Sequence, residues 1–175
     1  MIMTKKLTLL AMGIALFVAL SMCLQVPVFE NYYLCLGYVV MAVYCYSYGS
    51  FSGTIVGFFG VLLYCTVISG FRGMPGWALG NIVIGVFIGL AFRKTKEMSS
   101  VPVRTALQIL VILAATALGI LGVKSITESL LYGQPFLLRV AKNSYAFIAD
   151  SVVLCLSIPL CAALDPIAQK HRIRT

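Results

Sequence analysis

The chain has 175 residues, of which 61% are hydrophobic and 10% are charged, and its formal net charge is +8. Soluble domains contain roughly 45–50% apolar and about 25% charged residues, so this composition excludes a water-soluble globular fold. A membrane-spanning helix needs about 20 residues, so six such helices would use nearly the whole chain and leave no room for a soluble catalytic domain. We therefore expect an all-α integral membrane protein with six transmembrane helices, folded as a single domain over residues 1–175.

Six apolar runs follow one another along the chain and are the predicted transmembrane helices. They are Leu7–Leu24, Leu34–Tyr48, Thr54–Ser69, Trp77–Phe92, Ala106–Val123 and Tyr145–Leu164. Helix is expected for each run because backbone groups in lipid must be hydrogen-bonded within their own segment. The first run, which follows Lys5 and Lys6, also fits a signal peptide. We favour a retained helix because Met22 is large for a cleavage site and five more apolar runs follow.

The segments between these runs are rich in glycine, proline, polar and basic residues, which are typical of turns and loops. We expect loops at residues 25–33, 70–76, 93–104 and 133–142, and a tight turn at residues 49–53. The fifth helix can continue as a more polar helical segment to Leu131. Asp165 and Pro166 are expected to end the sixth helix, and a basic tail follows.

The lysine and arginine residues predict the orientation, because the cytoplasmic ends of membrane helices carry an excess of both. With both termini in the cytoplasm, the inner side holds Lys5, Lys6, Arg93, Lys94, Lys96, Arg104, Lys170, Arg172 and Arg174. The outer half then holds Arg72, Lys124, Arg139 and Lys142. The positive charge is thus explained by topology and by attraction to anionic lipid of the bilayer. Nucleic-acid binding is not expected, because no basic stripe is interleaved with exposed aromatic residues.

The sequence contains no known catalytic motif. The zinc-protease pattern H-E-x-x-H, the hydrolase pattern G-x-S-x-G and the phosphate-binding loop are all missing. The one histidine, His171, lies in the basic tail, and the six cysteines form no C-x-x-C pair, so they fit small packing residues of helices. We therefore expect no catalytic residues, no metal site and no intrinsic cofactor.

Polar and aromatic residues collect in the half of the chain that this topology places outside. Ionisable groups inside a bilayer usually form pairs or line a cavity, and aromatic rings beside amides suit a flat ligand with polar edges. Lys124 and Glu128 are spaced to share one helix face. The alternative for each aromatic residue is a packing or interfacial role. The predicted substrate-binding residues are Asn31, Tyr33, Tyr38, Arg72, Trp77, Asn81, Lys124, Glu128, Asn143 and Asp150.

Small residues recur at intervals of four on the first, third and fourth runs. Ala11, Ala15 and Ala19 form a smooth stripe on which another helix can approach closely. The stripe can dock a partner protein or pack inside the molecule, and the sequence leaves both open. Shorter pairs of the same spacing are Gly53 and Gly57, Gly76 and Gly80, and Gly85 and Gly89.

Over nearly its full length the chain resembles the substrate-binding S-components of energy-coupling factor (ECF) vitamin transporters. The resemblance rests on the chain length, six helices, basic ends, the alanine stripe, and the stretches from Tyr48 to Gly57 and from Gly73 to Asn81. It implies a vitamin pocket that opens outside and is covered by the loop at about residues 25–33. It also implies that Ala11, Ala15 and Ala19 dock on a transmembrane coupling protein bound to two ATPase subunits. ATP hydrolysis by these partners would topple the S-component in a prokaryotic cytoplasmic membrane and release the vitamin inside.

The vitamin itself is not determined by the resemblance, because S-components bind cobalamin, riboflavin, folate, pantothenate and other vitamin precursors. The many aromatic and few charged residues of the predicted site favour a large, mostly neutral ligand, so cobalamin is our first choice and riboflavin the second. Two alternatives to this function remain. One is a self-sufficient secondary carrier, for which we find no internal repeat. The other is a membrane enzyme or a non-transport assembly protein, and the sequence offers no catalytic cluster for the former.

Overall fold

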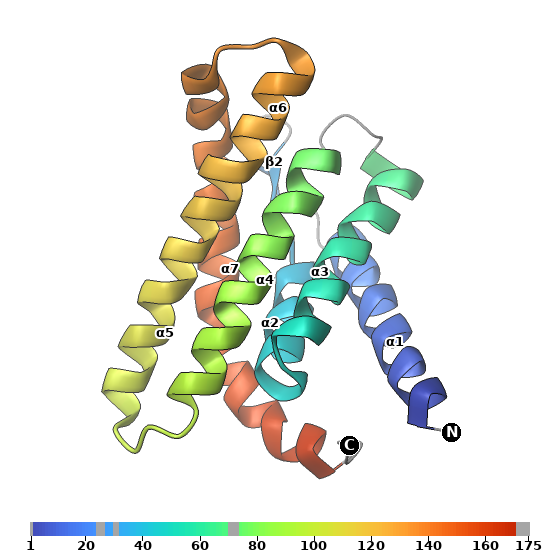
Figure 1. The fold of residues 1–175 in the computed structure, drawn as a ribbon, viewed down its shortest axis with the longest axis vertical. Helices are drawn as coiled ribbons and strands as arrows, with labels where there is room; N and C mark the ends of the chain where they lie inside the picture. Colours follow the sequence, from blue (N-terminus) through green and yellow to red (C-terminus); the bar gives the residue numbers. More distant parts are fainter. Residues whose placement is uncertain (1, 24–26, 30–31, 70–73, 171–175) are drawn as a thin grey trace.

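The computed structural model describes residues 2–23, 27–29, 32–69 and 74–170, and shows helices that run roughly along one axis (Figure 1). The elements are α1 (Ile2–Cys23), β1 (Pro27–Phe29), β2 (Tyr32–Tyr33), α2 (Gly37–Tyr48), α3 (Ser50–Tyr64), the π-helix η1 (Cys65–Ser69), α4 (Met74–Thr95), α5 (Val101–Thr116), the π-helix η2 (Ala117–Lys124), α6 (Ser125–Tyr132) and α7 (Phe136–Lys170). Strands β1 and β2 pair as a short antiparallel hairpin. The prediction of a helical membrane protein is confirmed.

Five segments within the described residues are long and apolar enough to cross a membrane. They are Thr4–Cys23, Ser50–Ile68, Met74–Thr95, Val101–Tyr132 and Phe136–Ala168. The predicted span Leu34–Tyr48 is the exception, because α2 has only 12 residues. A helix of that length is about 18 Å long, whereas the hydrocarbon layer is roughly 30 Å thick. The second predicted helix therefore exists, but it is too short to cross the bilayer alone.

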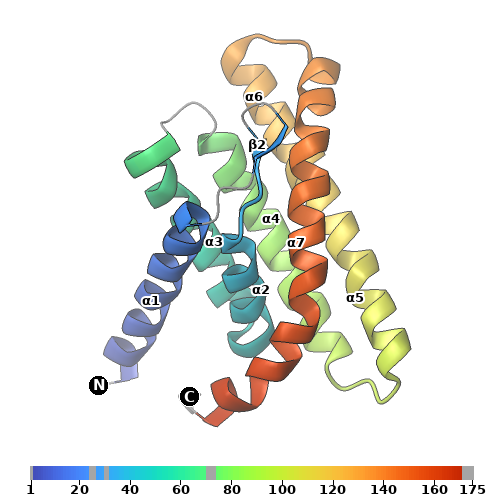
Figure 2. The same cartoon turned by 180° about the vertical axis from the view of Figure 1, so that it is seen from behind.

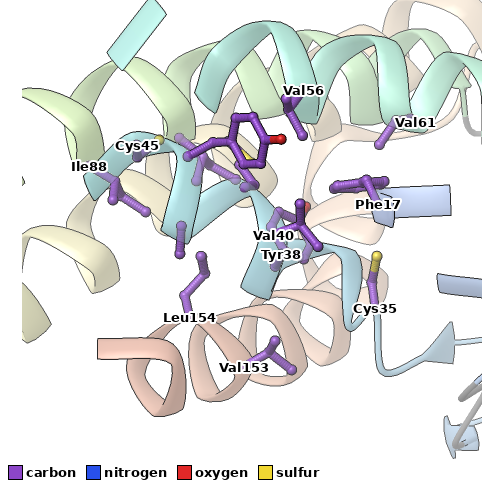
Figure 3. Close-up of a cluster of buried hydrophobic side chains, with 14 of the residues drawn as sticks. Phe17, Cys35, Tyr38, Val40, Cys45, Val56, Val61, Ile88, Val153 and Leu154 are labelled. Atoms are coloured by element: carbon purple, nitrogen blue, oxygen red, sulfur yellow. The ribbon is translucent and has the colours of Figure 1, made fainter. Parts of the chain in front are cut away.

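Helix α2 is the centre of the bundle. It packs against α1, α3, α4 and α7. Figure 3 shows the buried side chains around it, with Phe17 from α1, Val56 and Val61 from α3, Ile88 from α4, and Leu154 from α7. Because α2 is covered on several sides by protein, it needs little contact with lipid, and its short length is tolerated.

Close helix crossings explain the glycine pairs of α3 and α4. A Cβ atom at Gly57 would lie 2.5 Å from the sulfur of Met41 on α2. A Cβ atom at Gly85 would lie 2.6 Å from the hydroxyl oxygen of Thr54 on α3. In lipid, helices associate through close packing of such small residues. The four-residue spacing seen in the sequence therefore marks helix contacts inside the protein.

Another close crossing joins α4 to the π-helix η2. A Cβ atom at Gly80 would lie 2.7 Å from the carbonyl oxygen of Gly119, and one at Gly119 would lie 2.7 Å from the carbonyl oxygen of Gly80. Both obstacles are backbone atoms, which cannot rotate away as a side chain can. This crossing fixes the position of η2, and of the polar residues that follow it, relative to α4.

Several turns are shorter in the structure than the sequence predicts. Only Gly49, with a φ of 95°, separates α2 from α3, so most of the predicted turn at residues 49–53 is helical. The predicted loop at residues 133–142 is also wrong, because α7 begins at Phe136. Gly133 ends α6 in a left-handed conformation with a φ of 62°. Helix ends outside the apolar layer carry polar residues, and their composition resembles that of a loop.

The predicted end of the last helix at Asp165 and Pro166 is wrong as well. Helix α7 continues to Lys170 with Pro159 and Pro166 inside it. A proline within a helix removes one backbone N–H donor and bends the helix. Figure 2 shows that the final part of α7 turns away from the line of its first part.

Helix α1 begins and α7 ends at the same end of the bundle, where the α2–α3 and α4–α5 connections also lie (Figures 1 and 2). We call this the basic end, because it holds Lys5, Lys6, Arg93, Lys94, Lys96, Arg104 and Lys170. At this end the Nζ atom of Lys96 lies 2.6 Å from a carboxylate oxygen of Asp165 and 4.9 Å from the ring centre of Tyr46. These contacts join the α4–α5 connection to α7 and α2. Arg172 and Arg174 lie outside the described residues.

Candidate functional site

A hydrogen-bonded group of three side chains, which we call the tyrosine cluster, joins α2 to α4. The Tyr38 hydroxyl donates to the side-chain oxygen of Asn81 at 2.7 Å and accepts from the indole N–H of Trp77 at 2.8 Å. The Asn81 amide nitrogen donates to the carbonyl oxygen of Gly57 on α3 at 3.0 Å. Tyr38 and Asn81 are each 0% exposed. Three helices therefore meet at this cluster.

The local sequence explains how these residues come together. Pro75 stands near the start of α4, a position that suits proline because the first helical N–H groups need no partner within the helix. Trp77 and Asn81 follow four residues apart and share one face of α4. Tyr38 lies in the first turn of α2 and meets that face. The ring of Tyr64 packs edge-on against the Trp77 ring, with centres 5.8 Å apart.

Asp150 and Lys124 extend this cluster towards α7 and η2. The Asp150 carboxyl group contacts the Tyr38 hydroxyl, and Lys124 lies close enough to Asp150 for electrostatic attraction. Asp150 is 5% exposed and Lys124 is 9% exposed. Burying an isolated charge in a protein within a membrane is costly, so two opposite charges at this depth stabilise each other.

The π-helical turn of η2 shapes the next part of the site. The Ser125 hydroxyl donates to the carbonyl oxygen of Ile120, five residues earlier, at 3.1 Å. A π-helix has a wider turn than an α-helix and often occurs at functional sites. Here the wider turn ends at Lys124, so Lys124, Ser125 and Glu128 all face the interior of the bundle.

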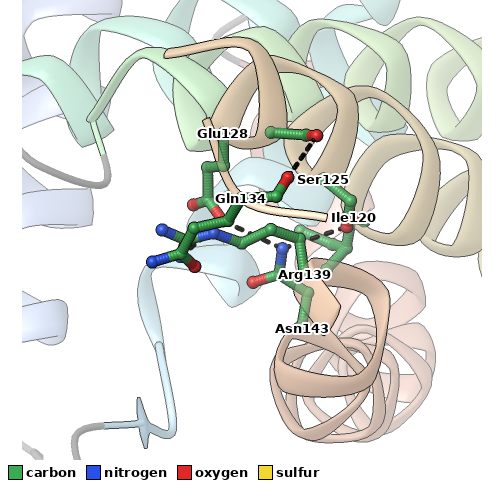
Figure 4. A network of polar contacts seen from close by, with 7 residues as sticks. Ile120, Ser125, Glu128, Gln134, Arg139 and Asn143 are labelled. Carbon is green, nitrogen blue, oxygen red and sulfur yellow. Dashed lines mark hydrogen bonds and ion pairs between the residues drawn. The ribbon is translucent and has the colours of Figure 1, made fainter. Parts of the chain in front are cut away.

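Glu128 is held from α7 by two side chains (Figure 4). The Asn143 amide nitrogen donates to Glu128 at 3.1 Å and to the Ser125 hydroxyl at 3.0 Å. A guanidinium nitrogen of Arg139 lies 3.5 Å from the same Glu128 oxygen, and the Arg139 guanidinium stands 5.0 Å from the ring centre of Tyr132. We call Lys124, Glu128, Arg139, Asn143 and Asp150 the charged cluster.

The structure brings most of the predicted site residues into one region, in the half of the bundle away from the basic end. Seven of them form the two clusters, namely Tyr38, Trp77, Asn81, Lys124, Glu128, Asn143 and Asp150. Asn31 and Arg72 lie outside the described residues. Tyr33 is in β2, whose hairpin packs against α7, but its side chain is outside the described part.

Two members of this region were missing from the predicted set, namely Arg139 and Ser125. The sequence predicts that Arg139 lies in a loop at residues 133–142, and its contact with Glu128 becomes apparent only because α7 begins at Phe136. Arg139 and Asn143 then stand four residues apart on one face of α7 and reach the same carboxylate. Ser125 gave no signal in the sequence, because serine is common in membrane helices.

The alanine stripe faces away from the bundle. Ala11, Ala15 and Ala19 are all exposed, whereas Gly13 and Phe17 on the opposite side of α1 are buried. A Cβ atom at Gly13 would lie 2.6 Å from the Tyr44 ring. The alternative that the stripe packs inside the molecule is therefore wrong, and the stripe is free to meet lipid or a partner.

The chemistry of the region is that of binding. The clusters supply hydroxyl, amide, indole, ammonium, guanidinium and carboxylate groups within a largely apolar bundle. Within the described part of the chain, no group of three or more His, Cys, Asp or Glu residues could hold a metal ion. These side chains can bind a polar, partly aromatic molecule by hydrogen bonds and ring contacts.

Comparisons with known proteins agree with this picture. A sequence model of the family described as "ECF-type riboflavin transporter, S component" matches residues 1–165. A UPF0397 protein of Vibrio atlanticus (strain LGP32) is 29% identical over 137 residues, which are 75% of this chain and 74% of that relative.

Proposed function

Because the match over residues 1–165 shows that this chain belongs to the family of ECF-type riboflavin transporter S components, we propose that it captures riboflavin outside the cell. Members of this family are multi-pass membrane subunits that bind a vitamin and are not enzymes. They work with an ECF module, which we propose comprises a transmembrane coupling protein and two ATPase subunits. The family match is the observation that carries the proposal.

The first choice of cobalamin as the ligand is not supported, since the description of the matching family names riboflavin. Riboflavin was the second choice and now takes its place. It is a flat ring system with amide-like edges and a chain of hydroxyl groups. The tyrosine cluster offers ring contacts, an amide and a hydroxyl for the ring system, and the charged cluster offers hydrogen-bonding groups for the hydroxyl chain. These contacts support a ligand of this shape and polarity.

The orientation in our proposal follows from the charges. With the basic end in the cytoplasm, as the positive-inside rule favours, both clusters lie in the outer half of the membrane. The β1–β2 hairpin packs against α7 in this half and belongs to the proposed cover of the pocket. The exposed stripe of Ala11, Ala15 and Ala19 is the proposed docking surface for the coupling protein.

The test is a binding titration on the purified, detergent-solubilised chain. We expect quenching of riboflavin fluorescence at a stoichiometry of one vitamin per chain, and no competition by cobalamin or pantothenate. Mass spectrometry of small molecules that copurify with the chain provides a second readout. A well-folded protein that binds a different vitamin would overturn the choice of ligand, and one that binds no vitamin would overturn the function.

A further inference from the structure

The charged cluster contains as many cations as carboxyl groups. Lys124 and Arg139 are the cations of the charged cluster, and Asp150 and Glu128 are its carboxylates. Lys124 is close enough to Asp150 for electrostatic attraction, and a guanidinium nitrogen of Arg139 lies 3.5 Å from Glu128. Both carboxylates are 5% exposed, so water screens these pairs only weakly. The two cations and the two carboxyl groups of the cluster are thus matched in number.

The other described cation of this half of the bundle does not change the balance. Lys142 is exposed on α7, whereas its neighbour Asn143 is buried and bonded to Glu128. Lys142 therefore points away from the cluster. Within the described residues, Arg139 is paired with Glu128 and Lys124 is attracted electrostatically to Asp150.

Two hydrogen-bonding atoms next to Glu128 are unused. The Nε atom of Arg139 and the side-chain oxygen of Gln134 are buried, and neither has a hydrogen-bond partner in the part of the chain that the structure describes. Figure 4 shows both side chains in the same network at the α6–α7 connection. One is an N–H donor and the other is a carbonyl acceptor. Hydroxyl groups both accept and donate, so they can bond to either atom.

We propose that the charged cluster selects a neutral, hydroxyl-bearing ligand and rejects the corresponding phosphate ester, and that Glu128 and Asp150 determine this specificity. The inference rests on the proposed function and adds a property to it. A phosphate dianion would lose its hydration, and the cations that could compensate are already neutralised by carboxylates. Each carboxylate would also repel it. A neutral hydroxyl chain has no ionic hydration to lose and is not repelled by the carboxylates.

The experiment compares riboflavin with its 5′-phosphate ester on the full chain in detergent. The readout is the ratio of the two dissociation constants, because packing losses that affect both ligands do not change this ratio. For the unmodified chain we expect the ester to bind at least roughly tenfold more weakly, which corresponds to about 1.4 kcal/mol. Glu128→Gln removes the carboxylate beside Arg139, and Asp150→Asn removes the carboxyl group that attracts Lys124. In each variant we expect the ratio to fall by about tenfold.

Two further variants test whether the ratio of dissociation constants depends on the charge of the cluster or on its shape. The double variant Glu128→Gln/Arg139→Gln is neutral again, so its ratio should return towards that of the unmodified chain. Asp165→Asn removes a negative charge from the ion pair at the basic end, far from the clusters, and should leave the ratio unchanged.

Equal or tighter binding of the ester by the unmodified chain would overturn the inference, even if no variant folds. An unchanged ratio in Glu128→Gln and Asp150→Asn would also overturn it, provided that both variants still bind riboflavin. Failure of the unmodified chain to bind riboflavin would instead count against the proposed function, so the two failures are distinguishable.

Discussion

The Tyr38 hydroxyl and the Asn81 amide form a 2.7 Å hydrogen bond between α2 and α4, and neither side chain is exposed to solvent. The Asn81 amide nitrogen in turn donates a hydrogen bond to the backbone carbonyl oxygen of Gly57 on α3. Three hydrogen bonds thus join α2, α3 and α4 and hold the Trp77 indole beside Tyr38.

The Tyr38→Phe variant should lose both stability and vitamin affinity. Removing the hydroxyl leaves the Trp77 N–H and the Asn81 oxygen without their partner, and an unsatisfied buried group costs about 1–3 kcal/mol. We expect a lower apparent unfolding temperature in detergent and a weaker riboflavin titration. Tyr48→Phe, at the other end of the same helix and outside both clusters, is the matched control. Equal behaviour of the two variants would contradict the role of Tyr38.

The Gly119→Ala variant should be destabilised. Its Cβ atom would lie 2.7 Å from the carbonyl oxygen of Gly80, so one of the two helices must shift. Such overpacking costs typically about 1–3 kcal/mol. Gly122→Ala lies on the same π-helix with no atom within 4 Å of the new Cβ, and should be neutral. Thermal unfolding of both variants in one detergent provides the measurement, and similar unfolding temperatures would show that the crossing is not tight.

The Ala15→Trp variant should separate binding from transport. Ala15 is exposed on α1, so a large side chain there leaves the bundle intact but blocks close approach of another helix. We expect unchanged riboflavin affinity and loss of riboflavin uptake when the chain is reconstituted with its ECF module. Leu156→Trp, at a lipid-facing position of α7 that is 72% exposed, should retain uptake. If Ala15→Trp transports normally, the stripe is not the docking surface.

The ion pair of Lys96 and Asp165 should contribute to stability but not to binding. It lies at the basic end, away from both clusters, and is only partly exposed. We expect Lys96→Met, Asp165→Asn and the double variant to yield a coupling energy of about 0.5–1.5 kcal/mol. Riboflavin affinity should not change. A change in affinity would indicate that the two ends of the bundle are coupled.

The sequence predicted the membrane class, the apolar runs and most of the clustered polar residues, because charged and amide groups stand out in an apolar chain. Asp150 and Asn81 were identifiable for this reason. Helix ends were less predictable. The residues from Phe136 to Asn143 are polar enough to resemble a loop, yet they form the first turns of α7 and carry Arg139. Whether polar residues near the membrane surface continue a helix depends on tertiary contacts.

The partners of each polar residue were not predictable at all. The spacing of Lys124 and Glu128 predicted a shared helix face, and both are buried on the same side of the bundle. It could not show that Arg139 and Asn143 reach Glu128 from α7, or that Asp150 approaches Lys124. The sequence likewise did not determine which vitamin binds, since the same few residue types can bind many different ligands.

The shortness of α2 has a consequence for the architecture of the outer half. Where a sixth full-length helix would stand, the chain instead supplies the β1–β2 hairpin, which packs against α7. In this part of the outer half a pair of antiparallel strands thus takes the place of a helix. If the hairpin is the cover proposed above, displacing it separates no two of the long helices, because it packs against α7 and not between helices.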